Sequence, residues 1–125
     1  MRATKIGRVA LGATVCVAGV SLAWFASAAA PAGAPADFSR CAGCHSTQAG
    51  QNKIGPSLAG VVGRKSGTED GYSYSPKNAN ITWDDATLDK FLASPAGVVH
   101  GTKMFMNLPS RSDRRNVIAY LDTLK

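Results

Sequence analysis

A histidine directly follows a pair of closely spaced cysteines in the first half of this chain. Cys41 and Cys44 are separated by two residues, and His45 comes next. Cys-x-x-Cys-His is the sequence at which c-type haem is attached. Two thiols one helical turn apart can add to the two vinyl groups of one porphyrin, and the next residue is then held against the iron. The motif predicts one covalent haem, with Cys41 and Cys44 as attachment points and His45 as proximal iron ligand, and a fold that wraps around this group.

Three other uses of these cysteines fit the sequence less well. A redox-active Cys-x-x-Cys pair of the thioredoxin kind needs a strand–helix context, which the flanking residues do not provide. A zinc site needs two further ligands, and His100 is the only other histidine of the chain. A disulfide between the two cysteines would be strained and would leave His45 without a role.

An iron atom held by one histidine has a sixth coordination position. A methionine sulfur in that position raises the potential and suits electron transfer. The second half of the chain offers His100, Met104 and Met106. The ordinary use of a loop methionine is core packing, and spacing alone does not decide between Met104 and Met106.

The first 28 residues have the pattern of a secretory signal peptide. Three basic residues lie within the first eight, residues 9–25 carry no charge, and Ala26-Ser27-Ala28 follows as a site for signal peptidase. Cleavage after Ala28 is the prediction, and export agrees with haem attachment outside the bacterial cytoplasm. The alternative is a retained membrane anchor, because an uncharged stretch of this length is at the lower limit of a membrane span.

The overall charge of the chain does not indicate nucleic-acid binding. The net charge is +6, from 14 basic and 8 acidic residues. Loss of residues 1–28 would remove three of the basic residues and leave a net charge of +3. The remaining charges form no long run of one sign, and three cysteines are too few for a disulfide framework.

The remainder of the chain predicts one small all-α domain. Residues 29–36 are predicted to be a flexible lead, and residues 37–125 form the domain. Helices are expected at about residues 34–45, 84–93 and 112–124, the second with a capping box formed by Thr82 and Asp85. Their apolar anchors recur at helical spacing. These anchors are Phe38, Leu88, Phe91, Leu92, Val117, Ile118, Leu121 and Leu124.

Long connections separate these helices. Residues 49–81 and 95–109 are rich in glycine and proline and are predicted to be loops. No strand is predicted. Short helices joined by loops of this length bury little surface by themselves, so a bound group is expected to supply much of the core.

Seven short blocks of the sequence occur in an order that is specific to one family. They are Cys41–His45, Gly55–Gly60, Gly63–Gly67, Gly71–Ser75, Ile81–Trp83, Gly101–Met104 and Val117–Leu121. In this order the chain resembles class I cytochrome c, the mitochondrial protein and its bacterial periplasmic relatives, over nearly all of residues 33–125. The resemblance implies a small cytochrome c fold, with three main helices and long loops wrapped around one covalently bound haem c.

The resemblance also implies a role for individual residues. Met104 would be the distal iron ligand, and the carbonyl of Pro56 would accept a hydrogen bond from His45. Gly33 would let the first and last helices cross closely. Three residues would hydrogen-bond or neutralise the haem propionates: Arg64, Tyr74 and Trp83. Asn78 and Thr102 would be polar groups near the distal side of the haem.

The function implied by the resemblance is electron transfer and not enzymatic catalysis. We expect a soluble, monomeric, periplasmic one-electron carrier that docks transiently on larger redox proteins. These are a cytochrome bc complex, a terminal oxidase, a photosynthetic reaction centre or a periplasmic dehydrogenase. Basic residues implied to lie near the haem edge are Arg40, Lys53, Lys103 and Arg111. The alternatives are a membrane-tethered cytochrome c and a ligand-binding or peroxidatic haem protein.

Overall fold

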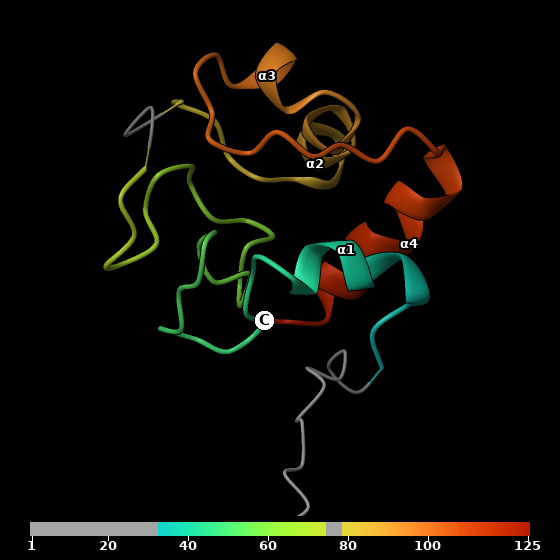
Figure 1. The fold of residues 1–125 in the computed structure, drawn as a ribbon, viewed down its shortest axis with the longest axis horizontal. Helices are drawn as coiled ribbons and strands as arrows, with labels where there is room; N and C mark the ends of the chain where they lie inside the picture. The colour runs from blue at the N-terminus through green and yellow to red at the C-terminus, as the bar shows by residue number, and fades with distance from the viewer. Residues whose placement is uncertain (1–32, 75–78) are drawn as a thin grey trace, which may run out of the picture.

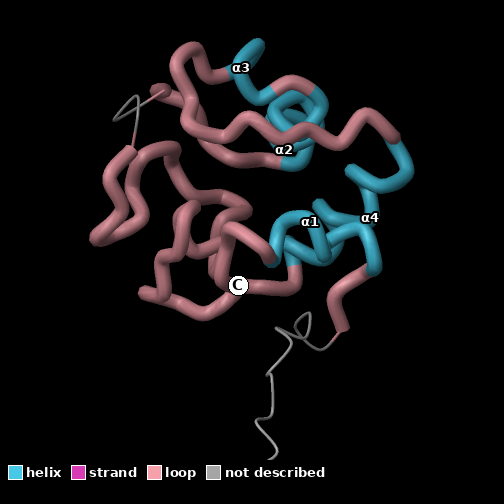
Figure 2. The backbone as a smooth tube through the Cα atoms, in the orientation of Figure 1, coloured by secondary structure: helices cyan, strands magenta, loops and turns pink. Residues whose placement is uncertain are grey.

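The computed structural model describes residues 33–74 and 79–125. Its elements are the 3₁₀ turn η1 (Ala36–Phe38) and four helices: α1 (Ser39–Ala42), α2 (Asp85–Ala93), α3 (Pro95–Val98) and α4 (Arg111–Asp122). The helices occupy the top and right of the view in Figure 1, and loops form the left side, as Figure 2 shows. Within the described residues the only strand-like pairing is an isolated bridge between Lys65 and Thr82. The predicted all-α fold with long loops is confirmed.

The first helix is shorter than its prediction of residues 34–45. Its regular part ends at Ala42, and the amides of Cys44 and His45 both donate to the carbonyl of Cys41, at 3.0 and 2.9 Å. The carbonyl of Cys44 then accepts a hydrogen bond from Gly55, at 2.8 Å. Because this loop contact takes the place of the next helical hydrogen bond, the chain turns out of the helix at the haem-attachment motif.

The second and third predicted helices are found nearly as expected, but the cap of α2 differs. Asp84, not Thr82, caps this helix, and its carboxylate accepts from the amide of Thr87 at 2.7 Å. These hydrogen bonds lower the pKa of Asp84, and the negative charge suits the positive end of the helix dipole. Ser110 caps α4 by accepting from the amide of Asp113.

Residues 95–109 are not loop throughout, as the sequence had predicted. Residues 95–98 form the short helix α3, which begins at Pro95. Proline ends α2 because it cannot continue a helix, but the same residue is well suited to the first position of the next one.

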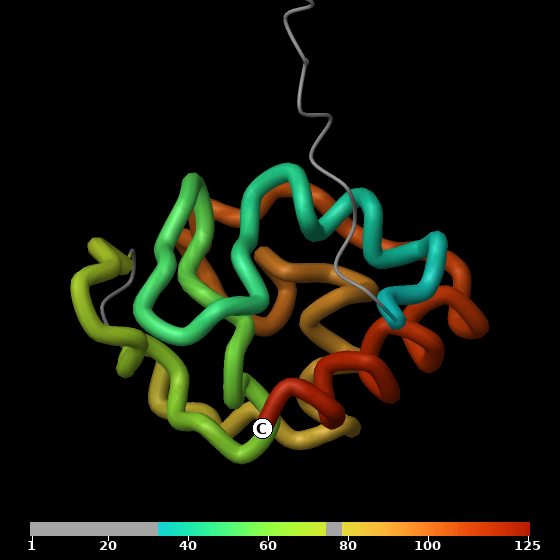
Figure 3. The backbone as a smooth tube through the Cα atoms, turned by 90° about the horizontal axis from the view of Figure 1, so that it is seen from below, coloured from blue at the N-terminus to red at the C-terminus, as the bar shows by residue number. Residues whose placement is uncertain are grey.

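The core joins both ends of the described chain. Phe38 is fully buried and packs edge-on against Tyr120 of α4, with ring centroids 4.8 Å apart. Figure 3 shows the start of the described chain lying beside α4. Of the predicted flexible lead, residues 33–36 are described, and Ala34 already packs against the core. The ordered domain therefore begins before residue 37.

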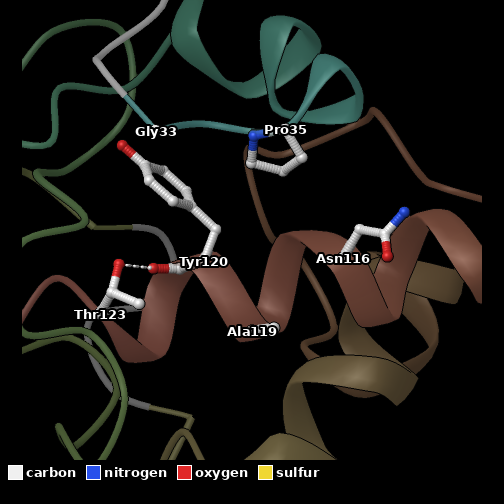
Figure 4. A pocket seen from close by; sticks show the side chains of 6 residues that line it. All are labelled: Gly33, Pro35, Asn116, Ala119, Tyr120 and Thr123. Carbon is white, nitrogen blue, oxygen red and sulfur yellow. Dashed lines mark hydrogen bonds between the residues drawn. The ribbon is translucent and has the colours of Figure 1, made fainter.

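Gly33 does not provide the close helix crossing that the resemblance implied. A Cβ atom built at Gly33 would meet nothing within 4 Å. Figure 4 shows the residue at the edge of an open depression that Pro35 and Tyr120 also line. Its φ of +84° is the feature that requires glycine, because other residues rarely adopt this conformation.

A buried arginine ties the loop that precedes α4 to α2. Arg114 donates from Nε to Asp89 at 2.8 Å, and from Nη1 to the carbonyls of Leu108 and Pro109 at 2.9 and 2.8 Å. The amide of Leu108 donates to the carbonyl of Leu92 at 2.7 Å. Together these contacts fix the end of the loop that carries the candidate methionine ligands.

Replacement of this arginine should destabilise the fold. We predict that Arg114→Met lowers the free energy of unfolding by about 2–3 kcal/mol, because it leaves two carbonyls near the core without their donor. Denaturant unfolding of the purified haem-loaded protein measures this. Arg115→Met, at an exposed neighbouring position, is the matched control and should change stability by less than about 0.5 kcal/mol. Equal stability losses in the two variants would contradict the prediction.

Candidate haem site

A cavity of about 370 Å³ opens between the helices and the loops, and it brings four predicted residues together. Cys41, Cys44, His45 and Met104 all line it. Much of the rest of its wall is made by apolar side chains that are buried. These are Val61, Leu88, Leu92, Val99, Val117 and Leu121. A concave apolar space with a few convergent polar groups is the usual form of a cofactor site.

The two cysteines are free thiols at the end of α1. Burial, and next the neighbouring Cys44, raise the pKa of Cys41 to about 11. A redox-active cysteine has a lowered pKa, so this environment does not fit the thioredoxin-like alternative. In the part of the chain that the structure describes, no group of three or more His, Cys, Asp or Glu residues could hold a metal ion, and the zinc alternative gains no support.

His45 is oriented by the loop that follows it. Its Nδ1 lies 2.7 Å from the carbonyl oxygen of Pro56, so this nitrogen carries the proton and donates. The predicted contact with Pro56 is present. Burial lowers the pKa of His45, the Pro56 hydrogen bond acts against this, and the charge of Lys53 adds to the lowering. The imidazole is therefore neutral near pH 7, and its Nε2 lone pair can bind a metal.

Gly55 makes this arrangement of His45 possible. A Cβ atom at position 55 would lie 2.3 Å from Cε1 of His45 and 2.6 Å from its Nδ1. Glycine is required here because the backbone runs directly against the imidazole ring.

The residues that line the cavity reduce the candidates for the sixth iron ligand from three to two. Met104 and Met106 both line the cavity, whereas His100 is exposed and does not. Met104 also packs against the core cluster, and its amide donates to the hydroxyl of Thr102 at 3.2 Å. Thr102 itself lines the cavity, as its predicted role requires.

Arg64, Tyr74 and Trp83 also line the cavity. The guanidinium of Arg64 donates to the carbonyls of Ala59 and Ser57, at 3.1 and 2.9 Å, and pairs with Glu69. Its Nε is buried and has no hydrogen-bond partner. An anionic oxygen entering the cavity, such as a haem propionate, would satisfy this donor. Asn78, which the resemblance places near the distal side of the haem, lies outside the described residues.

Tyr74 has a hydroxyl that can act as a second donor. The backbone amide of Glu69 donates to it at 3.3 Å, which leaves the hydroxyl proton available. Burial is the largest cause of the raised pKa of Tyr74, so the group stays protonated near pH 7. A covalent haem fits this site. The site offers two free thiols, a neutral imidazole that can bind a metal through Nε2, apolar walls and two hydrogen-bond donors.

Three of the four predicted basic residues lie at or near the cavity. Arg40 and Lys103 line it, and Lys53 acts electrostatically on His45. The Nζ atoms of Lys53 and Lys103 donate to the carbonyls of Ala42 and Ser73, at 2.7 and 2.6 Å. The fourth, at position 111, begins α4 beside Asp89 and does not line the cavity.

Glu69 is a residue of this region to which the sequence assigned no role. It lies in a glycine-rich loop, five residues after Arg64. An acidic residue so close to an arginine with an assigned role was the available signal, but only the closure of the loop shows that the two side chains meet.

Comparison with known proteins identifies the class to which this fold and site belong. The family model described as cytochrome c matches residues 32–125. Cytochrome c2 iso-2 of Magnetospirillum molischianum is 50% identical over 97 residues, which cover 75% of this chain and all of the relative. Cytochrome c2 of Rhodoblastus acidophilus is 46% identical over 70% of this chain and 86% of the relative.

Two solved structures agree with this result. Cytochrome cH from Methylobacterium extorquens has a TM-score of 0.64 and 41% identity, over 70% of this chain and 91% of that one. Ferricytochrome c2 from Rhodopseudomonas palustris has a TM-score of 0.65 and 38% identity, over 72% and 94%. The chain belongs to the cytochrome c family. Members carry one covalent haem c, and this protein is an electron carrier and not an enzyme.

Substitution of Gly55 should impair haem incorporation. We predict that Gly55→Ala loses more than half of its haem, because the added methyl group displaces His45 from the carbonyl of Pro56. The ratio of haem absorbance to protein, checked by intact mass, measures this. Gly43→Ala is the control, since its Cβ atom would meet only the carbonyl of Arg40, at 3.9 Å. Full haem content in Gly55→Ala would show that the ring does not need its observed position.

Proposed function

We propose that this protein is a periplasmic one-electron carrier in which Cys41 and Cys44 attach the haem and His45 and Met104 bind its iron. The observation that carries the proposal is the convergence of these four side chains on one apolar cavity. A bound haem c supplies reversible one-electron chemistry at its iron.

The residues around the cavity hold both ligands in position. Pro56 fixes the tautomer and orientation of His45 through the 2.7 Å contact with Nδ1, which raises the basicity of Nε2. The amide of Met104 donates to the hydroxyl of Thr102, and Arg114 fixes the end of the same loop through the carbonyl of Leu108. Ligands that are held in place change little between oxidation states, and this favours fast electron transfer.

The polar residues of the cavity are proposed to bind the propionates. Arg64 and Tyr74 each present an available donor, and Trp83 lies on the same wall. Asn78 and Thr102 are proposed as polar groups near the distal side of the haem. Around them the apolar walls exclude water, so that charges in the cavity are weakly screened.

The assignment of Met104 is tested by its replacement. We predict that Met104→Ala abolishes the ferric absorption band at the red end of the spectrum that methionine–iron ligation produces, and lowers the reduction potential. Met106→Leu, which alters the other methionine of the cavity, should keep both. Loss of the band in Met106→Leu and its survival in Met104→Ala would transfer the role to Met106. A wild-type protein without the band would favour the ligand-binding or peroxidatic alternative.

Export to the periplasm is proposed from residues 1–28, which lie outside the described residues. Their basic start, uncharged stretch and Ala26-Ser27-Ala28 site have the signal-peptide pattern. Among the described residues no helix is long and apolar enough to cross a membrane. The intact mass of the protein purified from its periplasmic fraction should correspond to residues 29–125 plus one haem. A mass that retains residues 1–28, in the membrane fraction, would instead show a tethered carrier.

The partners are proposed to be larger redox complexes with acidic docking surfaces, approached by a monomer. Arg40 and Lys103 lie at the cavity and Lys53 near His45, so their positive charges surround the place where an electron enters. Such charges steer transient encounters and do so most strongly at low salt.

This steering can be measured with small redox probes of opposite charge. We predict that Lys53→Gln combined with Lys103→Gln slows reduction by ferrocyanide at low ionic strength, on the order of threefold. Reduction by hexaammineruthenium(II), a cation, should become faster. The glutamine side chains keep a hydrogen-bond donor for the carbonyls of Ala42 and Ser73. Lys90→Gln is the control, because Lys90 is exposed on α2. Because Lys90→Gln removes one charge and the test variant removes two, an effect of Lys90→Gln half as large on the logarithm of the rate would show that only net charge matters.

A further inference from the structure

An ion pair lies directly behind the polar wall of the cavity. Arg64 and Glu69 are in contact, and their side chains are only 16% and 13% exposed. Arg64 lines the cavity, whereas Glu69 does not. The carboxylate therefore contacts the guanidinium without itself lining the cavity.

Glu69 contacts both donors of that wall. Its carboxylate binds Nη1 of Arg64, and its backbone amide donates to the hydroxyl of Tyr74 at 3.3 Å. The free donors of the wall, Nε of Arg64 and the Tyr74 hydroxyl, are left for a group in the cavity. Glu69 thus positions the two side chains and also adds one negative charge behind them.

We propose that Glu69 lowers the reduction potential of the haem by cancelling the positive charge that Arg64 presents to the cavity. The proposal rests on the proposed haem site and deepens it. The positive charge of an unpaired Arg64 would stabilise the reduced state of the haem by Coulomb attraction. The adjacent carboxylate of Glu69 opposes this stabilisation. Because both side chains are largely buried, solvent and salt screen these charges only weakly.

Two effects of removing the carboxylate act in the same direction. The loss of a negative charge near the cavity makes reduction of the iron easier. In addition, Arg64 without its carboxylate partner neutralises a propionate more completely. Both effects stabilise the reduced state, so the sign of the prediction does not depend on which one is larger.

The test is the potential of Glu69→Gln in the haem-loaded protein. Glutamine keeps an oxygen that accepts from Arg64 but removes the charge. In the titration one electron passes from ferrocyanide, which becomes ferricyanide, to the ferric iron, which becomes ferrous, and no bond forms or breaks. We expect the equilibrium constant for this reduction to rise about fivefold, or about 40 mV at 59 mV per factor of ten.

Asp70→Asn is the matched control. It makes the same change in charge one residue away, at an exposed position, and should produce less than a third of the shift. Equal shifts in the two variants, or no shift in Glu69→Gln, would overturn the proposal and leave Glu69 as a purely structural residue.

A second variant covers the case in which Glu69→Gln folds poorly. Glu69→Ser removes the same charge with a smaller side chain, and its potential must also rise. The red absorption band is recorded on each variant. If the band is present and the potential does not change, the Glu69 proposal fails while the ligand assignment stands. If the band is absent in the wild type, the ligand assignment itself fails.

Discussion

The fold depends on a core that its own side chains do not fill. Leu88, Leu92, Val117 and Leu121 belong to the hydrophobic cluster and also form the wall of the 370 Å³ cavity. Without a bound group these apolar side chains would face a void or water, and they would lose part of the stabilisation that burial provides. Folding and haem binding are therefore thermodynamically coupled in this chain.

The two sides of the cavity are built by different means. The proximal side is local, because Cys41, His45, Gly55 and Pro56 lie close in sequence and the turn between them sets the imidazole directly. The distal side depends on contacts between distant elements, with Arg114 of α4 holding the loop that carries Met104. The proposed distal ligand, Met104, is consequently the ligand that is more easily lost when the fold is weakened.

Much of the proximal side and of the helices could be predicted from the sequence. The helix at 84–93 was predicted to within one residue, because Leu88 and Leu92 recur at helical spacing and Pro95 ends the pattern. The rule that proline ends a helix also led to a loop being predicted where α3 lies, since Pro95 begins this helix. The first helix was predicted too long because its end is set by a loop contact to Cys44, which no local pattern contains.

The distal side and the charges were less predictable, for the same physical reason. Whether His100 or Met106 faces the cavity depends on the path of a loop, and the spacing of residues does not determine that path. The pairing of Arg64 with Glu69 likewise requires a closed loop.

Charge in this protein acts through position more than through amount. Arg64 of the cavity lining is paired with Glu69, so the carboxylate offsets much of its positive charge at the cavity. Lys53 and Lys103 are exposed but tied to backbone carbonyls, which fixes their charges near the cavity without burying them. A charge held by the backbone keeps its direction as a partner approaches, and less side-chain entropy is lost on docking. The same lysines therefore connect the loops around the cavity and lie on the face that we propose for electron transfer.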